Sequence, residues 1–188
     1  MFSGLSKREK MVYSGISQEI GIANLLRSNG FDYPILLNRE FLDIRSGRFR
    51  ECDLIFITPF KIYCVESKNY NGYIAGKRFD KKWRFASSGR RGEVANPYTA
   101  NRTRIRLMRS KFYSSGYYPP YIDSVIVVPD RCKIHCDTGN VYSLSDFISL
   151  VKVDSVSMKE KYKVDAVCTF LENNSRLSEK GRDVREKK

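Results

Sequence analysis

The sequence has little that would place the protein in a membrane. No apolar run approaches the roughly 18 residues that a membrane-spanning helix needs. The charged first ten residues are not followed by an apolar segment of the secretory type, and no myristoylation or prenylation motif is present. We therefore expect a cytoplasmic protein without a membrane partner.

Cysteine and histidine are also scarce, with five and one residues respectively. An odd number of irregularly spaced cysteines does not indicate a disulfide framework and fits a reducing compartment. Cys132, His135 and Cys136 are too few for a closed zinc site, which needs four ligands. The alternation of Cys132, Ile134 and Cys136 predicts a strand instead.

Negative charge is in deficit. Lys and Arg number 34 against 21 Asp and Glu, so the formal charge of the 188-residue chain is +13. Such a surplus favours a polyanionic partner, either nucleic acid or an anionic membrane surface. Because nothing indicates membrane anchorage, nucleic acid is the favoured partner.

Hydrophobic periodicity predicts an α/β fold with a mixed central sheet and flanking helices. The predicted elements are a helix over 7–27, strands over 33–42, from Asp53 and from Ile62, a helix from Asn96-Pro97, and a buried strand over 121–129. Asn96 suits the N-cap of its helix and Pro97 the first helical position. The resulting order is αβββαβ.

The C-terminal part carries two further expectations. Ser157-Met-Lys-Glu160 has the pattern of a capping box and predicts a last helix from there to about Leu171. The polar, charged residues 173–188 lack periodicity and predict a disordered basic tail. Residues 1–172 would then form one domain.

The stretch from Asp53 to Gly76, DLIFITPFKIYCVESKNYNGYIAG, reads as a hairpin with charged residues in apolar strands. Period 2 puts Glu66 and Lys68 on one face, and Asp53 opens the preceding strand. Burying these groups is costly unless they pair with each other or with a cation. A plain cross-strand ion pair worth about 0.2 to 1 kcal/mol is the simpler alternative.

Two motifs in this stretch resemble a known family. An acid, a hairpin turn and Glu66-Ser67-Lys68 resemble the metal site of the PD-(D/E)XK nuclease superfamily. The continuation ESKNYNG, together with a later Trp83 and the Asn96-Pro97 step, resembles the nuclease-related (NERD) domain more narrowly. The resemblance spans about residues 15–108. It implies a restriction-endonuclease-like core and a metal-dependent nuclease that hydrolyses phosphodiester bonds in DNA, as an endonuclease rather than an exonuclease, in DNA processing or defence.

The resemblance also implies roles for single residues. Asp53, Glu66 and Lys68 would be catalytic, and Glu19 on the first helix an accessory catalytic residue and metal or water ligand. Mg²⁺ or Mn²⁺ prefers oxygen ligands, so Asp53, Glu66 and the Ser67 carbonyl are expected to hold it. Lys68 beside two carboxylates would stay charged and would either orient the hydroxide or neutralise the transition state.

The chain departs from the family pattern at two positions. Gln18-Glu19 stands where Gly-Glu is usual, so the acid is kept but its small neighbour is not. Ala100-Asn101 stands where Gln-Asn is usual. The missing amide puts a contact to substrate or to Lys68 in doubt.

Basic residues follow the hairpin and continue along the helix from Asn96. Lys and Arg at such places contact phosphates without reading sequence. The candidates for nucleic-acid binding are Lys77, Lys81, Lys82, Arg84, Arg90, Arg91, Asn101, Arg102, Arg106 and Arg109. The interleaved aromatics Phe79, Trp83 and Phe85 are expected to pack in a hairpin rather than stack on bases.

Two other classes of function stay open. A non-catalytic nucleic-acid-binding module would keep the fold and basic face, and would bind without Mg²⁺. An interaction or membrane-surface protein would bind anionic lipid through the same basic patch. Many proteins of the resembling superfamily act as dimers, so a homodimer also stays open.

Overall fold

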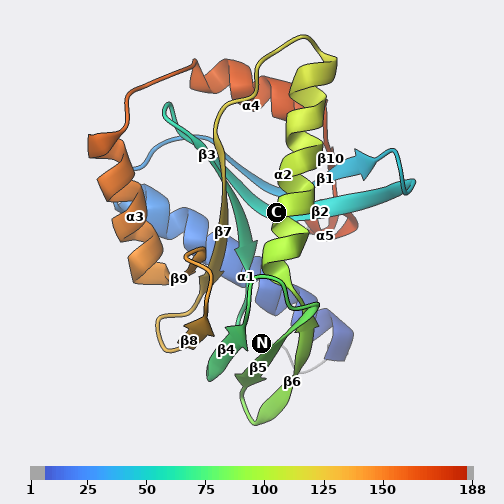
Figure 1. Cartoon of the computed structure of the whole chain (residues 1–188), viewed down its shortest axis with the longest axis vertical. Helices are drawn as coiled ribbons and strands as arrows, with labels where there is room; N and C mark the ends of the chain where they lie inside the picture. The colour runs from blue at the N-terminus through green and yellow to red at the C-terminus, as the bar shows by residue number, and fades with distance from the viewer. Residues whose placement is uncertain (1–6, 186–188) are drawn as a thin grey trace.

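A six-stranded mixed sheet separates two layers of helices in the computed structural model, which describes residues 7–185 and places side chains from 17 to 182 (Figure 1). Its strands, in spatial order, are β10 (Arg176–Leu177), β1 (Ile35–Asp43), β2 (Arg48–Ile57), β3 (Ile62–Ser67), β7 (Ile122–Val128) and β9 (Val141–Ser143). Strands β1 to β3 are antiparallel neighbours, whereas β7 and β9 run parallel to β3. The predicted αβββαβ order is confirmed.

Each face of this sheet has its own apolar core. On one face, helices α1 (Lys7–Ser28) and α3 (Leu144–Ser157) bury Ile22, Leu26, Phe147 and Val151 against the sheet. On the other face, α2 (Pro97–Ser114) and α4 (Val164–Asn173) bury Ile105, Met108, Phe112 and Leu171. None of the helices within residues 7–185 is long and apolar enough to cross a membrane.

A second sheet lies beside the N-terminal end of α2 (Figure 1). It consists of β6 (Arg90–Ala95), β5 (Lys82–Ser87), β4 (Tyr73–Gly76) and β8 (Lys133–Cys136). Trp83 is buried between this sheet, Tyr98 and β7, and Phe85 stacks on Tyr70 with ring centroids 4.4 Å apart. The predicted packing of these two aromatics is confirmed, but that of Phe79 is wrong, because its ring is exposed. The predicted strand around Ile134 is confirmed as β8.

The start of α2 is as predicted. The Asn96 side chain accepts hydrogen bonds from the backbone N–H groups of Tyr98 and Thr99 at 2.9 and 3.3 Å, and Pro97 is the first helical residue. The Asn96 amide also donates to the carbonyl of Asp80 at 2.7 Å. One side chain therefore caps the helix and fastens the loop after β4 to it.

Halfway along β1 and β2, the alternation of side chains between the two sides of the sheet is reversed. Asn38 has φ of 53°, a left-handed conformation that Asn tolerates better than most residues. The ladder pairs Leu37 with Leu54 and Arg39 with Cys52. Leu54 packs in the core under α1, whereas Cys52, two positions earlier, packs in the core under α2. Asp53 therefore lies where the alternation of buried side chains reverses.

The predicted start of the last helix at the capping box 157–160 is wrong, whereas its predicted course to about Leu171 is confirmed from Val164 onward. Ser157 ends α3, and α4 begins only at Val164. Met158 packs in the core under α1 and α3, whereas Leu171 packs in the core on the opposite face. A single straight helix cannot serve both faces of one sheet, so the chain must break between them.

The predicted disordered tail is also wrong for the part of it that the structure describes. Residues 176–177 form β10, which pairs with β1, and Glu179–Arg185 form helix α5. The Arg176 guanidinium donates to Glu40 at 2.9 Å and also lies over the Phe49 ring. Specific contacts to β1 and β2 offset the low hydrophobicity that predicted disorder. Residues 186–188 lie outside the described residues.

Candidate active site

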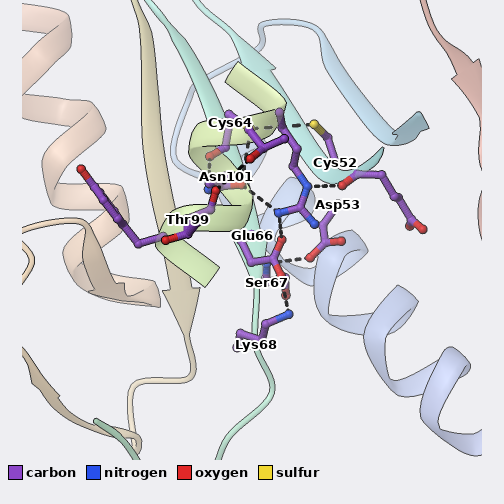
Figure 2. Close-up of polar contacts among 12 residues, drawn as sticks. Cys52, Asp53, Cys64, Glu66, Ser67, Lys68, Thr99 and Asn101 are labelled. Atoms are coloured by element: carbon purple, nitrogen blue, oxygen red, sulfur yellow. Dashed lines mark hydrogen bonds and ion pairs between the residues drawn. The ribbon is translucent and has the colours of Figure 1, made fainter. Parts of the chain in front are cut away.

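Asp53 and Glu66 come together at the end of the β2–β3 hairpin (Figure 2). Leu54 pairs with Val65 in the ladder, so Asp53 and Glu66 are the next facing positions. The Asp53 carboxylate accepts a hydrogen bond from the Ser67 backbone N–H at 2.9 Å. Burial, and then the negative charge of Glu66, raise the pKa of Asp53 above its usual value. The two acids are therefore electrostatic neighbours, as the sequence predicts.

Glu66 is buried between two cations. Lys68 Nζ contacts one carboxylate oxygen, and Arg104 Nη1 lies 2.5 Å from the other. Burial alone would raise the pKa of Glu66, but Lys68 and Arg104 outweigh it and hold the pKa below its usual value. Burial would likewise lower the pKa of Lys68, but Glu66 and Asp53 raise it. Lys68 is therefore charged, as predicted.

Arg104 is a residue that sequence reasoning missed. Its neighbours Arg102, Arg106 and Arg109 were candidates for phosphate contacts, whereas Arg104 points into the site. Arg104 Nε donates to the Glu51 carbonyl and Nη1 donates to Asn101 Oδ1 at 3.2 Å. Position 104 follows Asn101 by three residues, so helical spacing placed it on the inward side. That spacing was the available signal.

Glu19 lies on α1, which covers the face of the sheet opposite to α2, and it approaches the region of Asp53 from that side. Its buried carboxylate contacts Lys180 Nζ of α5, and Lys180 also lies 3.8 Å from Glu51 Oε1. Burial raises the pKa of Glu19 to about 7; Lys180 opposes this shift and the charge of Asp53 adds to it. Lys180 was missed because the sequence predicted disorder for its segment.

The oxygen donors suit a hard cation in their chemistry. Carboxylates of Asp53 and Glu66 and the carbonyl of Ser67 are the ligand types that Mg²⁺ and Mn²⁺ prefer. The buried Ser67 Oγ, beside them, has no hydrogen-bond partner among the described residues. Among the side chains that the structure places, 17–182, no three His, Cys, Asp or Glu residues converge closely enough to hold a metal ion. Glu19 therefore does not form one ligand cluster with Asp53 and Glu66 in this arrangement.

A cleft of about 650 Å³ lies between β2, the loop after β4 and the start of α2, and its lining does not include Asp53, Glu66 or Lys68. Arg104 and Glu51 form part of its wall. Phe79 and Lys81 line it from the loop, and Ala100, in place of the family Gln, lines it from α2. The missing Gln amide would therefore have belonged to the wall of the cleft.

The basic residues predicted to bind nucleic acid all lie on the surface. The exposed positions are Lys77, Lys81, Lys82, Arg84, Arg90, Arg91, Arg102, Arg106 and Arg109. The prediction for Asn101 is wrong. Its side chain is fully buried and donates to the carbonyls of Cys64 and Val125 at 2.9 and 3.0 Å, so it links β3 to β7 instead of reaching solvent.

The family model for the nuclease-related domain matches residues 14–129. This range runs from α1 to the end of β7 and contains Glu19, Asp53, Glu66, Lys68 and Arg104. No curated protein and no solved structure matches the chain. Lys180 lies outside the matched range.

Proposed function

The chain belongs to the nuclease-related domain family, and from this premise we propose that it is a metal-dependent endonuclease that hydrolyses phosphodiester bonds in DNA. The observation that carries the proposal is the grouping of Asp53, Glu66 and Lys68 at the ends of two adjacent strands. The chain carries a charge of +13, which suits a phosphodiester substrate, and two adjacent carboxylates are the ligand type that a divalent cation prefers.

Mg²⁺ or Mn²⁺ would be held by Asp53, Glu66 and the Ser67 carbonyl. Such an ion, when bound, supplies an acidified water and stabilises negative charge on the scissile phosphate. The Ser67 N–H orients Asp53, and Arg104 orients Glu66, so neither carboxylate has to be ordered when substrate arrives. Preorganised side chains of this kind lower the cost of reaching the transition state.

Lys68 would neutralise the negative charge that develops on the phosphate oxygens. Glu66 and Asp53 raise its pKa, so at neutral pH it carries its proton and cannot act as a free-amine base. Its backbone N–H donates to the Val127 carbonyl at 2.9 Å, which continues the parallel ladder and fixes the start of its side chain. Lys68 is therefore placed to bind an anion beside Glu66.

One observation favours the non-catalytic binding module as a second candidate. The buried acids already have cations of the chain itself as partners, Lys68 and Arg104 for Glu66 and Lys180 for Glu19. A protein that keeps its acids for structure would need such pairing. Cleavage and binding must therefore be measured separately.

The deciding experiment incubates supercoiled plasmid, linear duplex and single-stranded DNA with the protein in Mg²⁺, Mn²⁺ or EDTA. We expect cleavage only with metal, its loss in the isosteric variant Asp53→Asn/Glu66→Gln, and a drop of roughly 10² to 10³-fold in Lys68→Ala. Lys152→Ala, which removes an exposed lysine of α3 outside the cleft and outside the predicted binding residues, is the matched control and should retain the wild-type rate. Circular dichroism checks that each variant folds.

Cleavage that persists in EDTA or in the Asp53/Glu66 variant would reject the proposed mechanism. Intact substrate in every metal, with DNA binding unchanged by EDTA, would instead support the binding module.

A further inference from the structure

A groove of about 870 Å³ lies between the C-terminal turns of α2, the loop before β7 and α4. Figure 1 shows α4 beside the end of α2 that is farther from the second sheet. Tyr113, Tyr117, Tyr118 and Tyr121 line it and are exposed by 58, 62, 88 and 53%. Large aromatic side chains are usually buried, so four exposed tyrosines in nine consecutive residues point to a binding surface.

The tyrosines are held in place before any ligand arrives. Gly116, with φ of 76°, follows the last turn of α2. The Gly116 N–H donates to the Tyr113 carbonyl at 3.0 Å, and the Tyr117 N–H donates to the Phe112 carbonyl at 2.9 Å. This is the hydrogen-bond pattern of a Schellman motif, which fixes the chain after a helix. Tyr113 and Tyr118 also meet edge to face at 6.2 Å. Little conformational entropy would therefore be lost when a ligand stacks on them.

The groove is electropositive. Its charged lining residues are Arg109 and Lys161, and no carboxylate of the side chains placed by the structure lines it. Arg102, Arg106, Arg109 and Tyr113 recur at helical spacing, so exposed arginines lead from the start of α2 into the groove. The eleven helical steps from 102 to 113 advance roughly 16 Å along the helix axis, so the arginines form a line rather than a single contact point.

We propose that this groove binds single-stranded nucleic acid, with bases stacked on Tyr113 and Tyr118 and phosphates contacting Arg109 and Lys161. Stacking on aromatic rings between cationic side chains is the way single strands are bound without sequence preference. A duplex hides its base faces in its own stack and would gain only the phosphate contacts. A protein partner would also use tyrosines, but the lack of carboxylates and the arginine line favour a polyanion.

This proposal does not depend on cleavage, so it is tested in EDTA by fluorescence anisotropy with three probes. They are a 15-mer of thymidylate, a 15-mer with the same phosphates but abasic sugars, and a 15-base-pair duplex. We expect wild-type protein to prefer thymidylate over the abasic strand, and Tyr113→Ser/Tyr118→Ser to lose at least about tenfold in affinity for thymidylate. Duplex binding should change by less than about threefold in that variant.

A second pair of variants tests the charge. Lys161→Ala should weaken binding of both 15-mer strands, whereas Lys152→Ala, an exposed lysine of α3 outside the groove, should leave it unchanged. Both variants remove one positive charge, so they differ only in where it lies.

Equal affinity of wild-type protein for the thymidylate and abasic strands would overturn the proposal, as would an unchanged thymidylate affinity in the tyrosine variant. A wild-type dimer that the tyrosine variant breaks, with unchanged affinity for the thymidylate strand, would assign the groove to a second copy of the chain instead. Failure of DNA cleavage leaves these binding results intact, so the two proposals fail separately.

Discussion

Replacing Arg104 by methionine should destabilise the protein far more than replacing its neighbour Arg102. Arg104 pairs with buried Glu66 at 2.5 Å and donates to the Glu51 carbonyl and to Asn101. Breaking a buried pair typically costs 3 to 5 kcal/mol, but Glu66 keeps Lys68 as a partner, so we expect about 2 to 4 kcal/mol. Arg102 is exposed, and Arg102→Met should change the free energy of unfolding by less than about 0.5 kcal/mol.

Urea unfolding at pH 7, followed by circular dichroism, measures both variants. The loss should shrink as the pH falls through the lowered pKa of Glu66, because protonated Glu66 no longer needs a cation. The double variant Arg104→Met/Glu66→Gln should lose less than the sum of the single losses, with a coupling of about 1 to 3 kcal/mol. Equal losses for Arg104→Met and Arg102→Met, or additive losses in the double variant, would refute the pairing of Arg104 with Glu66.

Three further predictions concern stability. Burial raises the pKa of Glu19 from 4.5 to about 7, so between these pH values the native protein binds a proton at Glu19 that the unfolded chain does not. The free energy of unfolding should therefore fall as pH rises from 5 to 7, and Glu19→Gln should flatten that decline in urea unfolding. Asn101→Ala removes two buried hydrogen bonds to strand carbonyls and should cost about 1 to 3 kcal/mol in the same assay, with an unchanged m value. In Gly76→Ala the new Cβ would lie 2.2 Å from the Trp83 ring, so this variant should have a lower melting temperature in calorimetry. In Gly139→Ala the new Cβ meets nothing within 4 Å, so the melting temperature should not fall.

Local patterns predicted most of the fold because they depend on neighbours in sequence. Asn96 and Pro97 started α2 where the capping preference placed it, and Trp83 packed where its hairpin was expected. Predictions failed where distant segments decide the outcome. The capping box at 157–160 has good local chemistry, but the chain has to pass from one face of the sheet to the other at that point.

Predictions of the functional residues likewise failed where the packing of distant segments decides the outcome. Asn101 is polar and lies on a helix rich in arginine, so its sequence suggested a surface contact. The structure shows that its amide donates to the carbonyls of two parallel strands, a buried arrangement that depends on where α2 packs. The exposed positions of the basic residues were predictable, because long charged side chains rarely find partners inside a fold.

The sequence by itself determined that Glu66 and Lys68 share a face beside the strand that Asp53 opens, whereas the side to which Asp53 points depends on the reversal near Asn38. A short turn joins two strands, and the two-residue period of a strand then sets which side chains share a face. Only the tertiary structure decided what surrounds them. Arg104 and Lys180 lie on helices that are distant in sequence from the acids they pair with. Local periodicity does not specify how those helices pack, and so it does not predict which cation lies beside each buried acid.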